Sequence, residues 1–284
     1  MHVPEKFLFS GLYFNGITPR ARAFPALAAR GFFAMKSMRS GHLIPISILL
    51  ALLFWELLAR FSGYPPFILP GPALVWQRFL QTLSDGSLLR HTLVTLEEVL
   101  LGLALGVITA TSLGYALAKF DWLERLLSPY IVASQSVPVV AIAPLLVIWF
   151  GAGLVSKVLI AALIVFFPVL INTIVGLRSV PAGLRDLMRS LQATPWQTFR
   201  LLEVPAALPV FLAGLRVGAT LAVIGAVVGE FVGANRGLGF LVNLGRGMYD
   251  TALVFVAVFA LITLAMLLYG AVALLETHLL AWRE

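Results

Sequence analysis

Six long apolar stretches constrain this chain more than any other feature of its sequence. They lie at about 43–60, 93–117, 128–150, 156–177, 208–233 and 252–276. Each is close to the roughly 20 residues that a helix needs to cross the hydrocarbon core of a bilayer. A backbone in lipid must satisfy its own polar groups, so each stretch is expected to be a helix. The sequence therefore predicts an all-α polytopic membrane protein with six transmembrane helices.

Composition excludes the soluble alternatives. Hydrophobic residues make up 60% of the chain and charged residues 12%, whereas soluble domains carry about 25% charged residues. The absence of cysteine excludes thiolate catalysis, Cys-ligated zinc and iron–sulfur clusters. The histidines are scattered, and no Gly-x-x-x-x-Gly-Lys-Ser/Thr phosphate loop is present. The sequence therefore predicts no catalytic site, no metal and no cofactor.

The distribution of lysine and arginine indicates the orientation of the chain. With six spans, the side that holds both termini carries 13 of these residues and the other side carries 6, while Arg216 lies within the fifth span. An excess of Lys and Arg marks the cytoplasmic side, so both termini are predicted to be cytoplasmic. The net charge of +7 is attributed to this topology, and nucleic acid is not an expected partner.

The first 42 residues differ from the rest of the chain. Residues 1–42 hold six basic residues against one acid, Glu5, and lack a signal-peptide pattern. They are expected to form a basic, disordered cytoplasmic extension of a transmembrane domain at 43–284. The alternative is that translation starts at Met35 or Met38.

Polar side chains near the apolar stretches are candidates for a translocation pathway. The third and fourth stretches contain Pro138 and Pro168, which are expected to break or kink them. The candidates are Ser134, Gln135, Ser136, Asn172 and Glu230. Alternatively, the first four bond backbone groups freed by the prolines, and Glu230 is a structural carboxylate bonded to backbone N–H groups of 233–239 or to Arg236.

Small residues recur at every fourth position in two of the predicted spans. In the second they are Gly102, Gly106, Ala110, Gly114 and Ala118; in the fifth they are Gly214, Gly218, Ala222 and Ala226. Such stripes let helix backbones approach closely in a bilayer. These stripes either pack helices of one chain together or form the face through which two chains dimerise.

The predicted cytoplasmic segment 178–208 carries two short amphipathic patterns. Leu184, Leu187, Met188 and Leu191 fall at i, i+3, i+4 and i+7, one face of a helix. After Pro195, a second apolar stripe of Trp196, Phe199 and Leu202 precedes Pro205. Two such helices either lie on the bilayer surface or fill the groove of a partner.

This segment resembles the EAA loop of bacterial ABC importer permeases, Glu-Ala-Ala-x-x-x-Gly followed after nine residues by Ile-x-Leu-Pro. The matching residues are Asp186, Leu187, Met188, Gln192, Leu202, Val204 and Pro205. The chain departs from the family with Asp for Glu, Leu-Met for Ala-Ala and Gln192 for Gly, and Gln disfavours the positive φ that Gly allows. Residues 135–151 and 229–240 resemble segments of the nitrate, sulfonate and taurine branch.

The resemblance implies a non-catalytic permease in the bacterial inner membrane, which pairs with itself and works with two copies of a separate ATPase subunit and a periplasmic solute-binding protein. It also implies that the loop docks on the ATPase through Leu184, Asp186, Leu187, Met188, Leu191, Gln192, Ala193, Trp196, Phe199 and Pro205. Substrates in this branch include nitrate, sulfonates, taurine, aromatic carboxylates and thiamine or riboflavin precursors. The alternative is a stand-alone channel or secondary transporter, which would need charged intramembrane relays or an internal repeat.

Overall fold

A computed structural model describes residues 43–283 of the chain. The predicted basic extension at 1–42 lies outside the described residues. The chain divides into two compact units, residues 1–54 and 55–284. Helix α2 (Leu43–Phe61) crosses this boundary and coincides with the first predicted span. Within the described residues every regular element is a helix, which confirms the all-α prediction.

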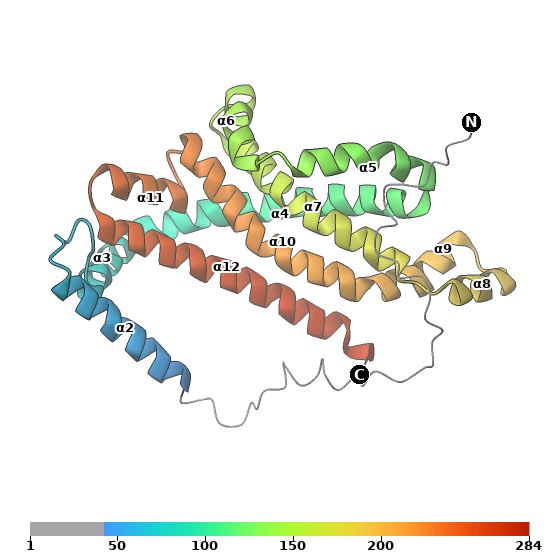
Figure 1. The fold of residues 1–284 in the computed structure, drawn as a ribbon, viewed down its shortest axis with the longest axis horizontal. Coiled ribbons are helices and arrows are strands. Elements are labelled where there is room, and N and C mark those ends of the chain that lie inside the picture. The colour runs from blue at the N-terminus through green and yellow to red at the C-terminus, as the bar shows by residue number, and fades with distance from the viewer. Residues whose placement is uncertain (1–42, 284) are drawn as a thin grey trace, which may run out of the picture. The chain divides into compact units, whose positions relative to one another are not determined.

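The second unit is a set of long helices joined by short connections (Figure 1). Its elements are α3 (Pro72–Ser84), α4 (Ser87–Lys119), α5 (Asp121–Gln135), α6 (Val139–Phe150), α7 (Leu154–Arg178), α8 (Ala182–Ser190), α9 (Pro195–Thr198), the π-turn η1 (Phe199–Glu203), α10 (Val204–Gly233), α11 (Leu238–Gly247), α12 (Thr251–Leu279) and η2 (Ala281–Arg283). Among the described residues four helices are long and apolar enough to cross a membrane: α4, α7, the continuous helix Pro195–Gly233 and α12. A fifth span results if α5 and α6 count as one.

The third predicted span, 128–150, is two helices rather than one. α5 ends at Gln135, α6 begins after Pro138, and the two helices are bent by 95°. Proline has no N–H to donate and disfavours the helical conformation of the residue before it. The predicted break therefore occurs at Pro138, whereas Pro144 lies within α6.

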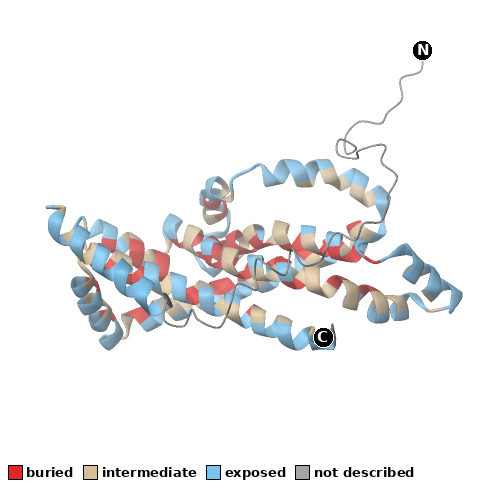
Figure 2. Cartoon of the chain, turned by 60° about the horizontal axis from the view of Figure 1, so that its bottom comes forward, coloured by how far each residue is buried: buried red, intermediate tan, exposed pale blue. Residues whose placement is uncertain are grey.

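Helix α7 packs against both α4 and α10 along stripes of small residues. A Cβ atom added at Gly102 of α4 would overlap Ala161 of α7, and one added at Gly214 of α10 would lie 2.5 Å from Cβ of Asn172 of α7. Figure 2 shows the buried residues concentrated along the inner faces of the long helices. These close approaches show that both stripes serve packing within the chain.

Candidate functional site

The helix predicted from Leu184, Leu187, Met188 and Leu191 is confirmed as α8. Leu184 is 44% exposed, Leu187 52% and Leu191 68%, while Met188 is half-buried. None of the nine residues of α8, all of which the structure describes, is buried. Three of the four side chains of this apolar face, Leu184, Leu187 and Leu191, are therefore exposed.

Gln192 ends α8 in the backbone conformation that the family's glycine would take. Its φ is 53°, in the left-handed region. Its N–H donates to the Arg189 carbonyl at 2.9 Å, and the Ala193 N–H donates to the Met188 carbonyl at 3.0 Å. These two bonds form a Schellman motif, which satisfies the last carbonyls of a helix. The chain therefore makes the turn that the family pattern predicts. It does so with Gln192 in a left-handed conformation that is strained for glutamine and unstrained for glycine.

A capping box begins the next helix. The Thr194 hydroxyl accepts from the Gln197 N–H at 3.3 Å, and the Gln197 side chain accepts from the Thr194 N–H at 2.8 Å. Pro195 occupies the first helical position, where its missing N–H costs nothing.

The prediction of a second separate short helix is wrong. α9 continues through η1 into α10, as one helix over Pro195–Gly233. The Val204 N–H donates five residues back to the Phe199 carbonyl, a π-type bond that admits an extra residue into the turn. This wider turn lets the helix run on past Pro205, which has no N–H to donate.

Aromatic contacts hold this segment to α4. The Trp196 and Phe199 rings stack at 5.5 Å between centroids, and Phe199 meets the Tyr115 ring of α4 edge-on at 5.4 Å. Trp196 is 66% exposed, whereas Phe199 and Pro205 are half-buried. Of the predicted apolar stripe, Phe199 therefore serves contacts within the chain, and Trp196 remains accessible.

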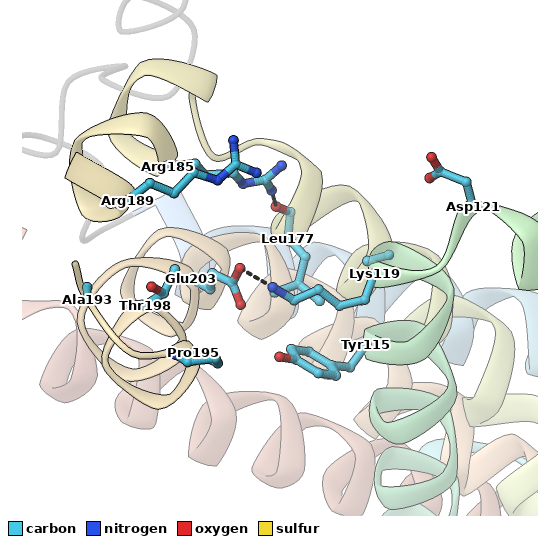
Figure 3. A pocket seen from close by; sticks show the side chains of 11 residues that line it. Tyr115, Lys119, Asp121, Leu177, Arg185, Arg189, Ala193, Pro195, Thr198 and Glu203 are labelled. Atoms are coloured by element: carbon cyan, nitrogen blue, oxygen red, sulfur yellow. Dashed lines mark hydrogen bonds and ion pairs between the residues drawn. The ribbon is translucent and has the colours of Figure 1, made fainter. Parts of the chain in front are cut away.

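A cavity of about 560 Å³ separates α8 and η1 from the ends of α4 and α7 (Figure 3). At its edge Arg185 donates to the Leu177 carbonyl at 2.7 Å. Glu203 and Lys119 point toward one another and form an ion pair across it (Figure 3). The Glu203 side chain is only 3% exposed. The pair could not be predicted from the sequence, because its partners lie 84 positions apart and neither belongs to a motif.

The five pathway candidates are not brought to one place. Ser134, Gln135 and Ser136 are exposed at the end of α5. Ser134 lines a cavity of about 480 Å³ that includes neither of the other two candidates, Asn172 and Glu230. The Asn172 side chain donates to the Pro168 carbonyl at 2.8 Å, one turn earlier in the same helix.

Glu230 lies in a buried polar cluster at the end of the bundle opposite to α8. Its carboxylate is 1% exposed and accepts from the Thr95 hydroxyl at 2.6 Å and from the Gly239 N–H. Beside it, Lys157 of α7 pairs with Glu98 of α4. These contacts follow the structural alternative, with Gly239 as the backbone donor, and Arg236 is exposed. Lys157 and Glu98 were not among the predicted site residues. The pattern that could have predicted their pairing is a basic residue and an acidic residue near the ends of two predicted spans that lie on the same side of the membrane.

Known proteins resemble the chain over most of its length. Residues 102–280 match the family model described as "Binding-protein-dependent transport system inner membrane component". The riboflavin transport system permease protein RibX of Chloroflexus aurantiacus is 52% identical over 84% of this chain and 89% of its own. The formylaminopyrimidine transport permease protein ThiX of Halalkalibacterium halodurans is 39% identical over 83% and 94%.

Solved structures show the same fold. A chain of the MetNI methionine ABC transporter, in an inward-facing conformation, superposes with a TM-score of 0.59. The alignment covers 68% of this chain and 95% of that chain, at 21% sequence identity. The arrangement of helices is thus that of an ABC importer transmembrane domain.

Proposed function

Because this chain belongs to the ABC importer permeases, the inner-membrane components of binding-protein-dependent transport systems, and to their nitrate/sulfonate/taurine-type branch, we propose that it imports riboflavin or a related vitamin precursor. The observation that carries the substrate is the identity of 52% to a riboflavin permease over 89% of that relative. The relative with a formylaminopyrimidine substrate supports the same class, a flat nitrogen heterocycle.

Uptake by cells or vesicles that hold the permease, its ATPase and its binding protein tests the substrate. Labelled riboflavin should accumulate only with ATP, and excess formylaminopyrimidine and excess taurine should be compared as competitors. Accumulation without ATP would favour a channel or secondary transporter. Uptake of taurine with no uptake of riboflavin would overturn the proposed substrate.

We infer further that the apolar face of α8 docks on the ATPase. Leu184, Leu187 and Leu191 are exposed on one side of a short helix at the end of the bundle. An amphipathic helix in a partner's groove gains its affinity from such a face. ATP-driven closure of two ATPase subunits would then move the two α8 helices of a homodimer and switch the pathway between inward-open and outward-open states.

The variant Leu187→Asp tests this docking. A charge left unpaired in the groove is expected to weaken ATPase binding by roughly 2–5 kcal/mol. Ala182→Asp is the matched control, because Ala182 lies on the same exposed helix but away from the apolar face. Co-purification with the ATPase should be lost for Leu187→Asp and kept for the control. Intact binding and import in Leu187→Asp would exclude α8 as the docking helix.

The remaining parts of the assembly follow the same proposal. The excess of Lys and Arg supports cytoplasmic termini, with α8 on the cytoplasmic side. A periplasmic binding protein would then deliver the solute at the opposite end, near the Glu230 cluster. The pathway would lie on the two-fold axis of the homodimer, with Ser134, Gln135 and Ser136 as the candidates whose exposure is compatible with lining it.

A further inference from the structure

The ion pair between Lys119 and Glu203 joins the docking segment to the bundle. Glu203 belongs to the π-turn η1, and Lys119 is the last residue of α4. The Glu203 side chain is 3% exposed and that of Lys119 is 38% exposed. The ammonium group of Lys119 also lies over the Tyr115 ring, 5.6 Å from its centroid. Removal of Lys119 would leave the Glu203 carboxylate buried without this cation, which is strongly destabilising.

Few other contacts tie α8 and the turn after it to the helices. Arg185 donates to the Leu177 carbonyl, and Phe199 packs edge-on against Tyr115. α8 itself buries none of its residues. A displacement of α8 would therefore reach the bundle through its chain connections to α7 and to the continuous helix Pro195–Gly233. It would also reach the end of α4 through Glu203 of η1.

The other end of α4 carries a second buried polar connection. Thr95 of α4 donates to Glu230 and accepts from the Leu238 N–H at 2.8 Å. Glu98, one turn further on, pairs with Lys157 of α7 at 2.6 Å. Thr95 thus fixes α4 to α10 and to the start of α11, and Glu98 fixes it to α7. With 33 residues, α4 extends about 50 Å at 1.5 Å per residue, so it connects the two ends of the bundle.

We propose that α4 acts as a rigid lever, which the Lys119–Glu203 pair connects to the docking segment and which Thr95 connects to the start of α11. Lys119 and Glu203 are then positioning residues for the transport cycle. They transmit the movement of α8 to the far end of the permease and do not contact the solute. This inference rests on the proposed docking of an ATPase at α8. Energy transfer of this kind requires packed elements that move as units between two arrangements.

The test uses the full permease with its ATPase and binding protein, reconstituted in lipid vesicles. Lys119→Met removes the charge while keeping the length of the side chain. We expect the ATPase to remain bound, and the riboflavin imported per ATP hydrolysed to fall about five-fold or more. The charge swap Lys119→Glu with Glu203→Lys should recover most of the ratio. Arg60→Gln is the matched control, because it breaks an exposed pair with Glu56 and should leave the ratio unchanged.

A second measurement needs no solute and follows the far end of the lever directly. The chain has no cysteine, so Arg236→Cys places a single exposed thiol in the turn before α11. Its labelling rate should change when ATP binds, and Lys119→Met should abolish this dependence. Two results would overturn the lever. One is an unchanged ratio of riboflavin imported to ATP hydrolysed in Lys119→Met, and the other is a labelling rate of Arg236→Cys that does not change when ATP binds. Failure of the unmodified permease to bind an ATPase would instead overturn the proposed function.

Discussion

Lys157 and Glu98 form an ion pair that is buried inside the helix bundle. Their Nζ and Oε1 atoms lie 2.6 Å apart, and the side chains are 7% and 1% exposed. Glu230 is the neighbour of Glu98, so two acidic side chains face one ammonium group. The Gly239 N–H donates to Glu230 and supplies further compensation from the start of α11. Charged groups at such depth persist only when they are paired in this way.

Lys157→Met should therefore destabilise the permease strongly. It leaves Glu98 and Glu230 buried without a cation, at a cost of about 3–5 kcal/mol. The exposed pair of Arg60 and Glu56 is the comparison, because breaking a surface pair costs about 0–1 kcal/mol. Thermal unfolding in detergent should show a much lower midpoint for Lys157→Met than for Arg60→Gln. Equal midpoints would mean that the buried pair does not stabilise the fold.

Gly225→Ala tests the close packing of α7 against α10. The added Cβ would lie 2.5 Å from Cα of Ala161, a backbone atom that has little freedom to move. Overpacking of this kind costs about 1–3 kcal/mol. Gly270→Ala in α12 is the matched control, because no atom lies within 4 Å of its added Cβ. Alanine there should raise stability by up to about 1 kcal/mol through its higher helix propensity. The two variants should thus shift the unfolding midpoint in opposite directions.

Gln192→Gly should stabilise the end of α8. At φ 53° the glutamine occupies a left-handed conformation that costs a non-glycine residue about 1–2 kcal/mol. Part of this gain is offset by the greater flexibility of glycine in the unfolded chain. Hydrogen exchange at the Ala193 amide, which donates to the Met188 carbonyl, should become slower. Gln192→Ala is the control and should leave the exchange rate of this amide nearly unchanged, because alanine is strained in the same conformation. Faster exchange in Gln192→Gly would contradict the Schellman turn.

Single cysteines distinguish the pathway candidates in this cysteine-free chain. Gln135→Cys should react readily with a water-soluble thiol reagent, because this position is exposed at the end of α5. Asn172→Cys should react slowly, because this position is half-buried and packs closely against Gly214. Labelling rates measured with and without ATP also test whether position 135 faces the pathway. Fast labelling of both would place Asn172 on an accessible surface.

Much of the fold follows from local features of the sequence. The apolar stretches predict α4, α7, α10 and α12 to within a few residues at most ends, because a backbone in lipid has no alternative to the helix. Pro138 predicts the break between α5 and α6, and the heptad-like spacing from Leu184 to Leu191 predicts α8. Each of these features acts over less than one helix length, so no knowledge of distant residues is needed.

Contacts between distant residues were decided by the tertiary structure. The sequence left two roles open for the small-residue stripes, and the approach of Gly102 and Gly214 to α7 selects packing within the chain. The pairs Lys157–Glu98 and Lys119–Glu203 join residues 59 and 84 positions apart. Periodicity tells which face of a helix is small or polar, but not which helix lies opposite. That choice depends on how the helices pack together, because a buried charge or a bare glycine is favourable only against a complementary neighbour.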